Sequence, residues 1–318
     1  MFFQSFQITG AAVLQSLLLA AVGYYLVKKE VLGSACLATL SRLVIEVTLP
    51  LLIFAQLIND FSFTLYPTWW IFPLMSIAIT FAGLLAGLVF GGFITGQQKK
   101  LQFLSLVSFQ NSGYLPLALI AALLPKDQTA PMFIYIFLFL LGFNLVMFSA
   151  GVYMLTFARD RRFELSSLFN PPVLATLLSL ALVFFGLQRF IPEFVLKPLR
   201  MTGDCTLPLA MFVVGGSLAQ IRLEHVDLKA MLLLVAGKLV LLPLAGLWFL
   251  KLVPLPELIG LLIVMQLAVP SATTLSVITT HYKKEDLLVS QGIFWTHIAS
   301  IVTIPIFLSL YFTFVVLK

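Results

Sequence analysis

Two nine-residue stretches of the chain follow one pattern. Residues 46–54 read EVTLPLLIF, and residues 204–212 read DCTLPLAMF. Each has an acidic residue followed two positions later by Thr-Leu-Pro-Leu, and each ends in Phe. The copies lie about half of the 318-residue chain apart. Because self-similarity at a fixed offset is the signature of an internal repeat, we predict that the chain consists of two related halves. Leu, Pro and Thr are common in apolar helices, so chance is the alternative.

The composition of the chain is that of a membrane protein. Hydrophobic residues make up 61% of it, charged residues only 10%, and the mean hydropathy is +1.08. Soluble domains average about 25% charged residues and rarely expose large apolar patches. In lipid every backbone polar group must be satisfied within the protein, so a spanning segment is a helix or part of a closed barrel. The apolar runs here are about twice as long as the strands of a membrane barrel. We therefore expect an all-α integral membrane protein.

The apolar runs predict ten transmembrane helices, because a helix of about 20 apolar residues crosses the hydrocarbon core. The expected spans are about 8–27, 36–58, 68–95, 101–124, 131–157, 170–188, 199–220, 228–250, 258–280 and 288–316. The first run lacks a preceding basic residue and a cleavage site, so we interpret it as a helix rather than a signal peptide. Loops between the spans are too short to hold a soluble domain.

Five spans in each half make the repeat an inverted one. An odd number of crossings sends the second copy into the membrane from the opposite side, which is the common plan of secondary transporters. We therefore predict two five-helix repeats, residues 1–160 and 165–318. Basic residues are concentrated in alternate loops, beginning with Lys28 and Lys29, and this bias places those loops in the cytoplasm. Both termini are then expected outside the cytoplasm, in a multi-pass protein of the cell (inner) membrane.

The fourth and ninth spans are expected to be broken at mid-membrane. Gln110 to Pro116 read QNSGYLP and Gln266 to Ser271 read QLAVPS, so each span has polar residues and a proline near its centre. Proline in a helix interior removes a hydrogen bond and costs about 3 kcal/mol. Pro116 suits the first position of a new half-helix, and the N-terminus of such a half-helix favours an anion. The alternative is that both prolines only bend their helices.

The two breaks define the candidate substrate site. We expect a pocket with hydrogen-bond donors aimed at a carboxylate. Its candidate residues are Gln110, Asn111, Ser112, Gly113, Tyr114, Pro116, Gln266, Pro270, Ser271, Thr273 and Thr274. Asn144 and Gln291 are further candidates for its lining.

Ionisable residues inside membrane spans are functional candidates, and we single out five of them. Arg42 and Glu46, four residues apart, are expected to be buried and to pair with each other or with Asp204. Glu46 and Asp204 occupy equivalent positions of the repeat, so we assign them, with Arg42, a gating, structural or proton-binding role, the alternative being contact with the substrate. Lys238 is expected either to attract an anionic substrate or to neutralise Asp204. His297 is a candidate for the pocket lining or for proton binding, the alternative being a hydrogen-bonded core residue.

Other classes of function find no support in the sequence. It has no metalloprotease helix, no phosphate loop and no nucleophile elbow, so we expect neither an enzyme nor an ATP-driven pump, and no metal or cofactor. Cys36 and Cys205 lie in or beside spans, which argues against a disulfide framework. The net charge of +6 lies in short loops, where membrane orientation explains it better than nucleic-acid binding does.

The motifs together resemble those of the bacterial branch of the auxin efflux carrier (PIN-like) family, over essentially the whole chain. The resemblance rests on the two proline-broken spans and on residues 208–219, 238–243 and 170–175. It implies a transport domain of spans 3–5 and 8–10, a scaffold of spans 1, 2, 6 and 7, elevator-type alternating access, and a homodimer. It also implies organic-anion substrates and places Asn111, Pro116 and Pro270 at the helix crossing that binds them. Leu267 and Ala268 depart from the polar pair Asn111-Ser112, so the half-sites are unequal.

We therefore expect a secondary carrier of a small organic anion such as a carboxylate. An inside-negative potential favours export of a monoanion by roughly 2.3 kcal/mol per 100 mV, which suits an efflux-type carrier. One alternative is a sodium-coupled symporter of the bile-acid type, which shares the repeat and the crossing. A membrane sensor that binds a ligand without moving it is the second alternative.

Overall fold

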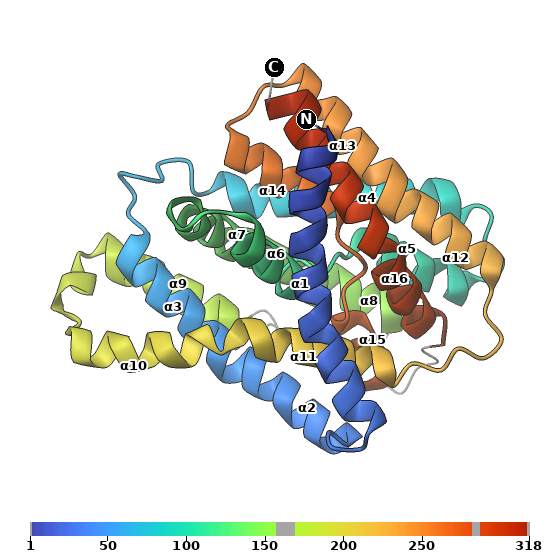
Figure 1. The fold of residues 1–318 in the computed structure, drawn as a ribbon, viewed down its shortest axis with the longest axis horizontal. Coiled ribbons are helices and arrows are strands. Elements are labelled where there is room, and N and C mark those ends of the chain that lie inside the picture. The colour runs from blue at the N-terminus through green and yellow to red at the C-terminus, as the bar shows by residue number, and fades with distance from the viewer. Residues whose placement is uncertain (1, 157–168, 282–286, 317–318) are drawn as a thin grey trace.

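The structure, a computed structural model, describes residues 2–156, 169–281 and 287–316, and helices make up its regular elements (Figure 1). Over these ranges seven helices or joined helices are long and apolar enough to cross a membrane. They are Phe2–Lys28, Ser34–Asp60, Ile71–Gly91, Lys126–Leu155, Glu193–Ala219, Leu228–Leu252 and Leu287–Val316. Three shorter apolar helices are Tyr114–Leu123, Pro171–Phe184 and Glu257–Ala268. The all-helical class predicted from the apolar runs is thus confirmed, whereas the inverted ten-span arrangement stays a prediction.

The individual elements follow the expected spans closely. They are α1 (Phe2–Lys28), α2 (Ser34–Leu43), α3 (Leu49–Asp60), α4 (Ile71–Gly91), α5 (Gln97–Ser108), α6 (Tyr114–Leu123), α7 (Lys126–Val146), α8 (Val152–Thr156), α9 (Pro171–Phe184), α10 (Glu193–Asp204), α11 (Thr206–Ala219), α12 (Leu228–Val235), α13 (Leu242–Leu252), α14 (Glu257–Ala268), α15 (Thr274–His281) and α16 (Leu287–Tyr311). Short π-helical segments continue several of them: η1 (Val44–Thr48), η2 (Met147–Gly151), η5 (Ala236–Leu241) and η6 (Phe312–Val316). Such segments often occur at functional sites in helices.

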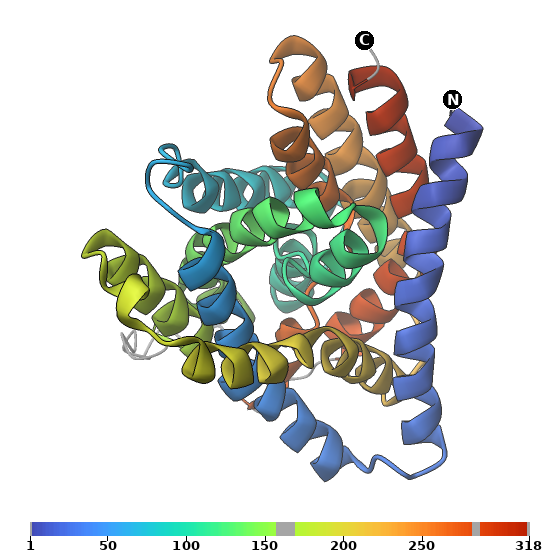
Figure 2. The same ribbon diagram turned by 60° about the vertical axis from the view of Figure 1, so that its left-hand side comes forward.

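Helix α1 packs tightly against α11 because each of the two helices has a glycine at the contact. A Cβ atom added to Gly215 would overlap the backbone of Ala20, and one added to Gly23 would overlap the backbone of Phe212. Small residues let helices approach closely in membranes, where van der Waals packing drives their association. Helix α1 also contacts α16: the Thr9 and Ser309 hydroxyls are 3.0 Å apart, and the Thr9 hydroxyl donates to the Pro305 carbonyl at 3.2 Å. The beginning of α1 and the end of η6 lie at the same end of the molecule (Figures 1 and 2).

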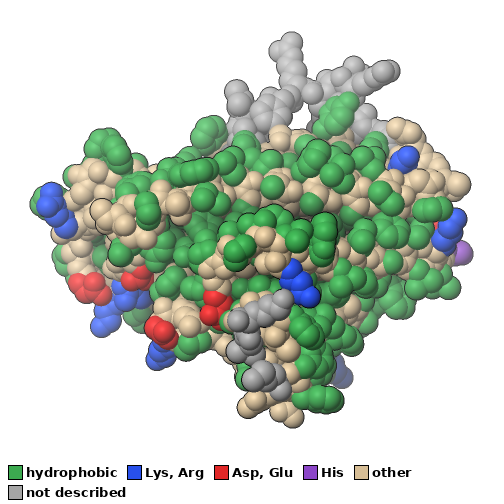
Figure 3. Space-filling model, turned by 90° about the horizontal axis from the view of Figure 1, so that it is seen from above, with side chains coloured by type: hydrophobic (Ala, Val, Ile, Leu, Met, Phe, Trp, Pro, Cys, Tyr) green, Lys and Arg blue, Asp and Glu red, His purple; other side chains and the backbone are tan. Residues whose placement is uncertain are grey.

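The surface of the chain is largely apolar. Hydrophobic side chains cover most of the face drawn in Figure 3. The large hydrophobic residues that are exposed on the chain include Trp70, Phe81, Phe194 and Trp248. An apolar surface of this extent suits lipid rather than water, and together with the seven long helices it makes the chain a multi-pass membrane protein.

The expectation that Arg42, Glu46 and Asp204 are buried is wrong. Arg42 and Glu46 do pair, with Nε 3.1 Å from Oε1, but their side chains are 75% and 49% exposed. Asp204 is also exposed, at the end of α10. The reason is that other helices cover only one side of α2, η1 and α10, so an ionisable residue within the apolar run still reaches the surface. The boundary between the expected halves lies outside the described residues, as do the basic residues at 159, 161, 162, 283, 284 and 318.

Candidate functional site

The two expected helix breaks are present, and they meet each other. Helix α5 ends at Ser108 and α6 begins at Tyr114, whereas α14 ends at Ala268 and α15 begins at Thr274. Between these ends, Gln110 and Ser271 form an isolated antiparallel bridge. The Asn111 N–H donates to the Pro270 carbonyl at 2.8 Å, and the Ala272 N–H donates to the Phe109 carbonyl at 3.0 Å. Backbone groups that leave their own helices thus find partners in the opposite break, as burial requires.

The two prolines are placed differently in their breaks. Gln110 and Ser271 face each other in the bridge, and the neighbouring Pro270 takes part in it through its carbonyl. Pro116 instead lies beyond the bridge, inside α6. A proline can interrupt a helix from either side of a break. Its presence therefore predicts that the helix is interrupted, but not at which residue the next helix begins.

Pro116 is the third residue of α6, not the first. Its missing N–H costs nothing there, because the first N–H groups of a helix have no intrahelical partner. Pro116 cannot bond the carbonyl four residues earlier, that of Ser112, and Gln266 Nε2 donates to this carbonyl at 3.1 Å instead. Pro270 is likewise not at a helix start, since α15 begins four residues later.

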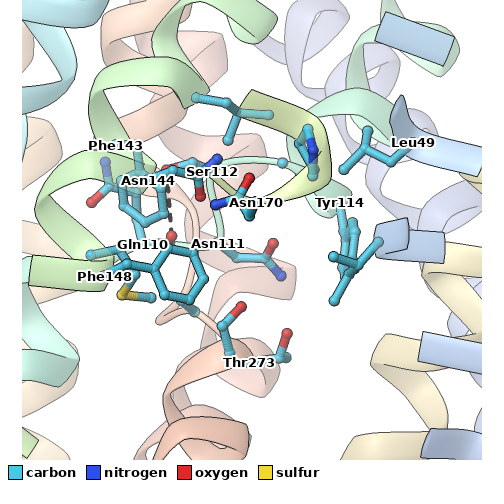
Figure 4. Close-up of a pocket in the computed structure, with 17 residues that line it drawn as sticks. Leu49, Gln110, Asn111, Ser112, Tyr114, Phe143, Asn144, Phe148, Asn170 and Thr273 are labelled. Atoms are coloured by element: carbon cyan, nitrogen blue, oxygen red, sulfur yellow. Dashed lines mark hydrogen bonds between the residues drawn. The ribbon is translucent and has the colours of Figure 1, made fainter. Parts of the chain in front are cut away.

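A cavity of about 110 Å³ lies beside the crossing (Figure 4). Seven expected site residues line it: Gln110, Asn111, Ser112, Gly113, Tyr114, Thr273 and Thr274. Asn144 lines it too, as expected, together with Phe143 and Phe148. The lining residues, all in the described ranges, include no charged side chain. At the start of α15 the Leu275 and Ser276 N–H groups donate to the Ala272 and Thr273 carbonyls, each at 3.2 Å. The cavity is therefore neutral, and its donors include the side chains of Asn111, Asn144, Thr273 and Thr274.

His297 orients the amide of Asn111. Its Nδ1 lies 2.8 Å from the Ile293 carbonyl, which can only accept, so Nδ1 carries the proton. In the neutral ring Nε2 is then an acceptor, and Asn111 Nδ2 lies 3.4 Å from it. His297 is buried and contacts the site residue from behind the cavity rather than lining it.

Asn170 is a lining residue that the sequence did not single out as part of the site. Its Oδ1 accepts from the Val173 N–H at 3.1 Å and caps α9, while Nδ2 is buried without a hydrogen-bond partner in the described part of the chain. The motif Asn-Pro-Pro does indicate a helix start. Only the folded chain, however, brings that helix start to the cavity.

A second, larger cavity of about 1,070 Å³ shares Ile45 and Thr273 with the first. Arg42 and Arg222 line it, with several serines of α2, α11, α15 and α16. Gln291, expected near the pocket, instead donates to the carbonyls of Arg222 and Glu224, at 3.3 and 2.7 Å. The larger cavity therefore adjoins the smaller one, which we call the inner cavity, and it has basic side chains in its walls.

The other expected residues support the crossing or lie away from it. Pro116, Gln266, Pro270 and Ser271 are buried and absent from the lining of both cavities. The Ser271 hydroxyl donates to the Leu106 carbonyl at 2.7 Å, and its N–H donates to the Thr296 hydroxyl at 3.2 Å.

Lys238 is 1% exposed in η5, lines neither cavity, and has no hydrogen-bond or ion-pair partner among the described residues. The expected pairing of Lys238 with Asp204 is therefore not found. Within the same ranges no three His, Cys, Asp or Glu side chains lie together as a metal site would require.

Comparison with known proteins is consistent with this geometry. The family model described as "Membrane transport protein" matches residues 9–162 and 156–308. An uncharacterised transporter of Methanocaldococcus jannaschii is 26% identical over 299 residues, which cover 92% of this chain and 96% of that protein. The similarity therefore extends over both halves of the chain.

Proposed function

The chain belongs to the membrane transport protein family, which comprises the auxin efflux carriers and their PIN-like relatives, and from this premise we propose that it is an efflux-type secondary carrier of a small organic anion such as a carboxylate. Family membership indicates transport rather than catalysis. In this proposal the chain crosses the cell (inner) membrane ten times as two inverted five-helix repeats. Both termini are outside the cytoplasm.

The observation that carries the proposal is the meeting of two helix starts at one uncharged cavity. Helices α6 and α15 both begin at residues that line it. The N-terminus of a helix carries about half a positive charge. Two such ends, with the amide of Asn111 and the hydroxyls of Thr273 and Thr274, favour a carboxylate. No acidic side chain is among the described residues that line the cavity, so none of these side chains repels an anion.

The position of the cavity supports elevator-type movement. Helices α4 to α8 and α12 to α16 would form the transport domain, and α1 to α3 with α9 to α11 the scaffold, which would join two copies as a homodimer. The cavity is lined on one side by η1, α3 and α9, and on the other by the crossing and by α7 with η2. A substrate there would contact both groups and travel with one of them. The larger cavity begins beside Ser34, close to the loop of Lys28 and Lys29, and would be the cytoplasmic entrance.

The proposal is tested by uptake of radiolabelled malonate, malate and indole-3-acetate into proteoliposomes, with imposed potentials and with or without proton and sodium gradients. Saturable flux of at least one anion is expected, with loss in Asn111→Ala and retention in Asn59→Ala. Asn59 serves as the control because its amide only donates to the Ala55 carbonyl on its own helix. Sodium-dependent flux would favour the symporter. Binding without flux of any anion would favour a sensor and contradict the carrier.

A further inference from the structure

The scaffold side of the inner cavity has a single polar side chain among its described residues. Ile45 and Leu49 line it from η1 and α3, and Pro172 and Asn170 from the start of α9. Three of these side chains are apolar, and the fourth is an amide. Figure 4 shows Asn170, Asn111 and Ser112 close to one another around the same space, with Thr273 beyond them.

The amide of Asn170 has a determined orientation. Pro171 and Pro172 have no N–H, so Val173 is the first residue of α9 with a backbone donor, and Asn170 Oδ1 accepts from it at 3.1 Å. Only the amide oxygen can accept, so the NH2 group must point away from the helix. Nδ2 is buried and has no acceptor within the described ranges. Buried donors are nearly always paired, so this NH2 group is available to a molecule bound in the cavity that Asn170 lines.

We propose that Asn170 is the scaffold's substrate-positioning residue, its Nδ2 donating a hydrogen bond to the carboxylate of the bound anion. The inference rests on the proposed function and adds to it a donor from the scaffold side. A bound anion is then held from both sides, by the crossing and by the start of α9. Asn170 selects substrates with an acceptor on the face toward the scaffold, and its hydrogen bond must break before the transport domain carries the anion away.

Two substitutions separate this role from helix capping. Asn170→Asp and Asn170→Ser both keep a side-chain oxygen at the N-cap, where Asn, Asp and Ser are about equally favourable. Both remove the NH2 group, and Asp also places a negative charge beside the anion. With whichever of malonate, malate and indole-3-acetate the wild-type protein carries, we expect the Kd to rise about tenfold or more in Asn170→Ser. Asn170→Asp should show no measurable binding.

Asp227→Asn is the matched control. Asp227 caps α12 by accepting from the Ala230 N–H at 3.1 Å, and it lines neither cavity. This substitution replaces a carboxylate by an amide at a helix start, the opposite of Asn170→Asp. Because Asp227 lies outside both cavities, the Kd for the anion should stay unchanged.

The outcomes distinguish this inference from the proposed function. If the wild-type protein carries an anion and both folded Asn170 variants bind it normally, the role of Asn170 is refuted while the carrier stands. If the wild-type protein carries none of the three anions, both proposals fail. Thermal unfolding in detergent monitors the fold. If Asn170→Ser does not fold, Asn170 is structural and the inference is overturned.

Discussion

Gln266 Nε2 donates a hydrogen bond to the backbone carbonyl of Ser112 at 3.1 Å, which joins the two halves of the chain at their crossing. The Ser112 carbonyl is available because Ser112 lies in the break before α6, whose first bond runs from the Leu117 N–H to the Gly113 carbonyl. The break thus leaves a carbonyl outside both helices, and a glutamine from the other half satisfies it. In a membrane interior such a carbonyl must find a partner.

Gln266→Leu should destabilise the protein and impair transport. The substitution leaves the buried Ser112 carbonyl without its donor, a loss of about 1–3 kcal/mol, and frees the segment that lines the cavity. We expect a lower unfolding temperature and reduced anion flux in proteoliposomes. Gln56→Leu is the control, since Gln56 donates only to Asp60 on its own helix, away from the cavities. Equal flux in Gln266→Leu and wild-type protein would show that this bond does not hold the site.

Gly215→Ala should separate α1 from α11. The added Cβ would overlap the Ala20 backbone, which cannot rotate away as a side chain does. Overpacking of this kind costs about 1–3 kcal/mol, measurable as a lower unfolding temperature. Gly10→Ala, on the partner helix α1 but with open space at its Cβ, should instead be neutral or stabilise by up to about 1 kcal/mol. Equal unfolding temperatures of the two variants would contradict the close contact.

A disulfide between α1 and α16 should stop transport. The Thr9 and Ser309 hydroxyls are 3.0 Å apart, close enough for a cysteine pair to be bridged. In a protein with Cys36 and Cys205 replaced by Ser, we expect oxidised Thr9→Cys/Ser309→Cys to lose flux and to regain it on reduction. The bridge would join the proposed scaffold to the proposed transport domain and so block an elevator movement.

The controls for this crosslink are the single variants Thr9→Cys and Ser309→Cys in the same background. Neither variant can form the α1–α16 bridge, so both should keep their flux under oxidising conditions. Undiminished transport with a complete α1–α16 crosslink would rule out movement between these two helices.

Lys238→Met should raise stability and lower transport. A buried amine without a partner is costly, and an apolar side chain of similar length removes that cost. Residues retained at such a cost within membrane spans are commonly functional. We expect a higher unfolding temperature and a lower maximal flux. Lys251→Met, at an exposed position near the end of α13, is the control and should change neither quantity. A destabilised Lys238→Met protein would mean that the amine is paired in the folded state.

Most of the helical segments could be predicted because hydropathy is a local property. Each expected span lies on a helix or on a pair of helices, and the breaks around Asn111 and Pro270 occur where polar residues and proline interrupt an apolar run. The exposure of Arg42 and Glu46 could not be predicted in this way, since it depends on which side of α2 and η1 another helix covers. The positions of Pro116 and Pro270 were also misjudged, because either side of a break accepts a proline.

The sequence alone determined that this chain is an all-helical membrane protein of the auxin efflux carrier-like family, with two helices broken at polar, proline-containing segments. The length of an apolar run, a helix-breaking residue and a repeated motif are local features of the sequence. They can be recognised without knowing which residues are neighbours in space. Only the tertiary structure decided that Gln110 faces Ser271, that Gln266 satisfies Ser112, and that the cap of α9 presents Asn170 to the cavity. These relationships join residues far apart in sequence, and their partners are chosen by packing and by the need to pair every buried polar group.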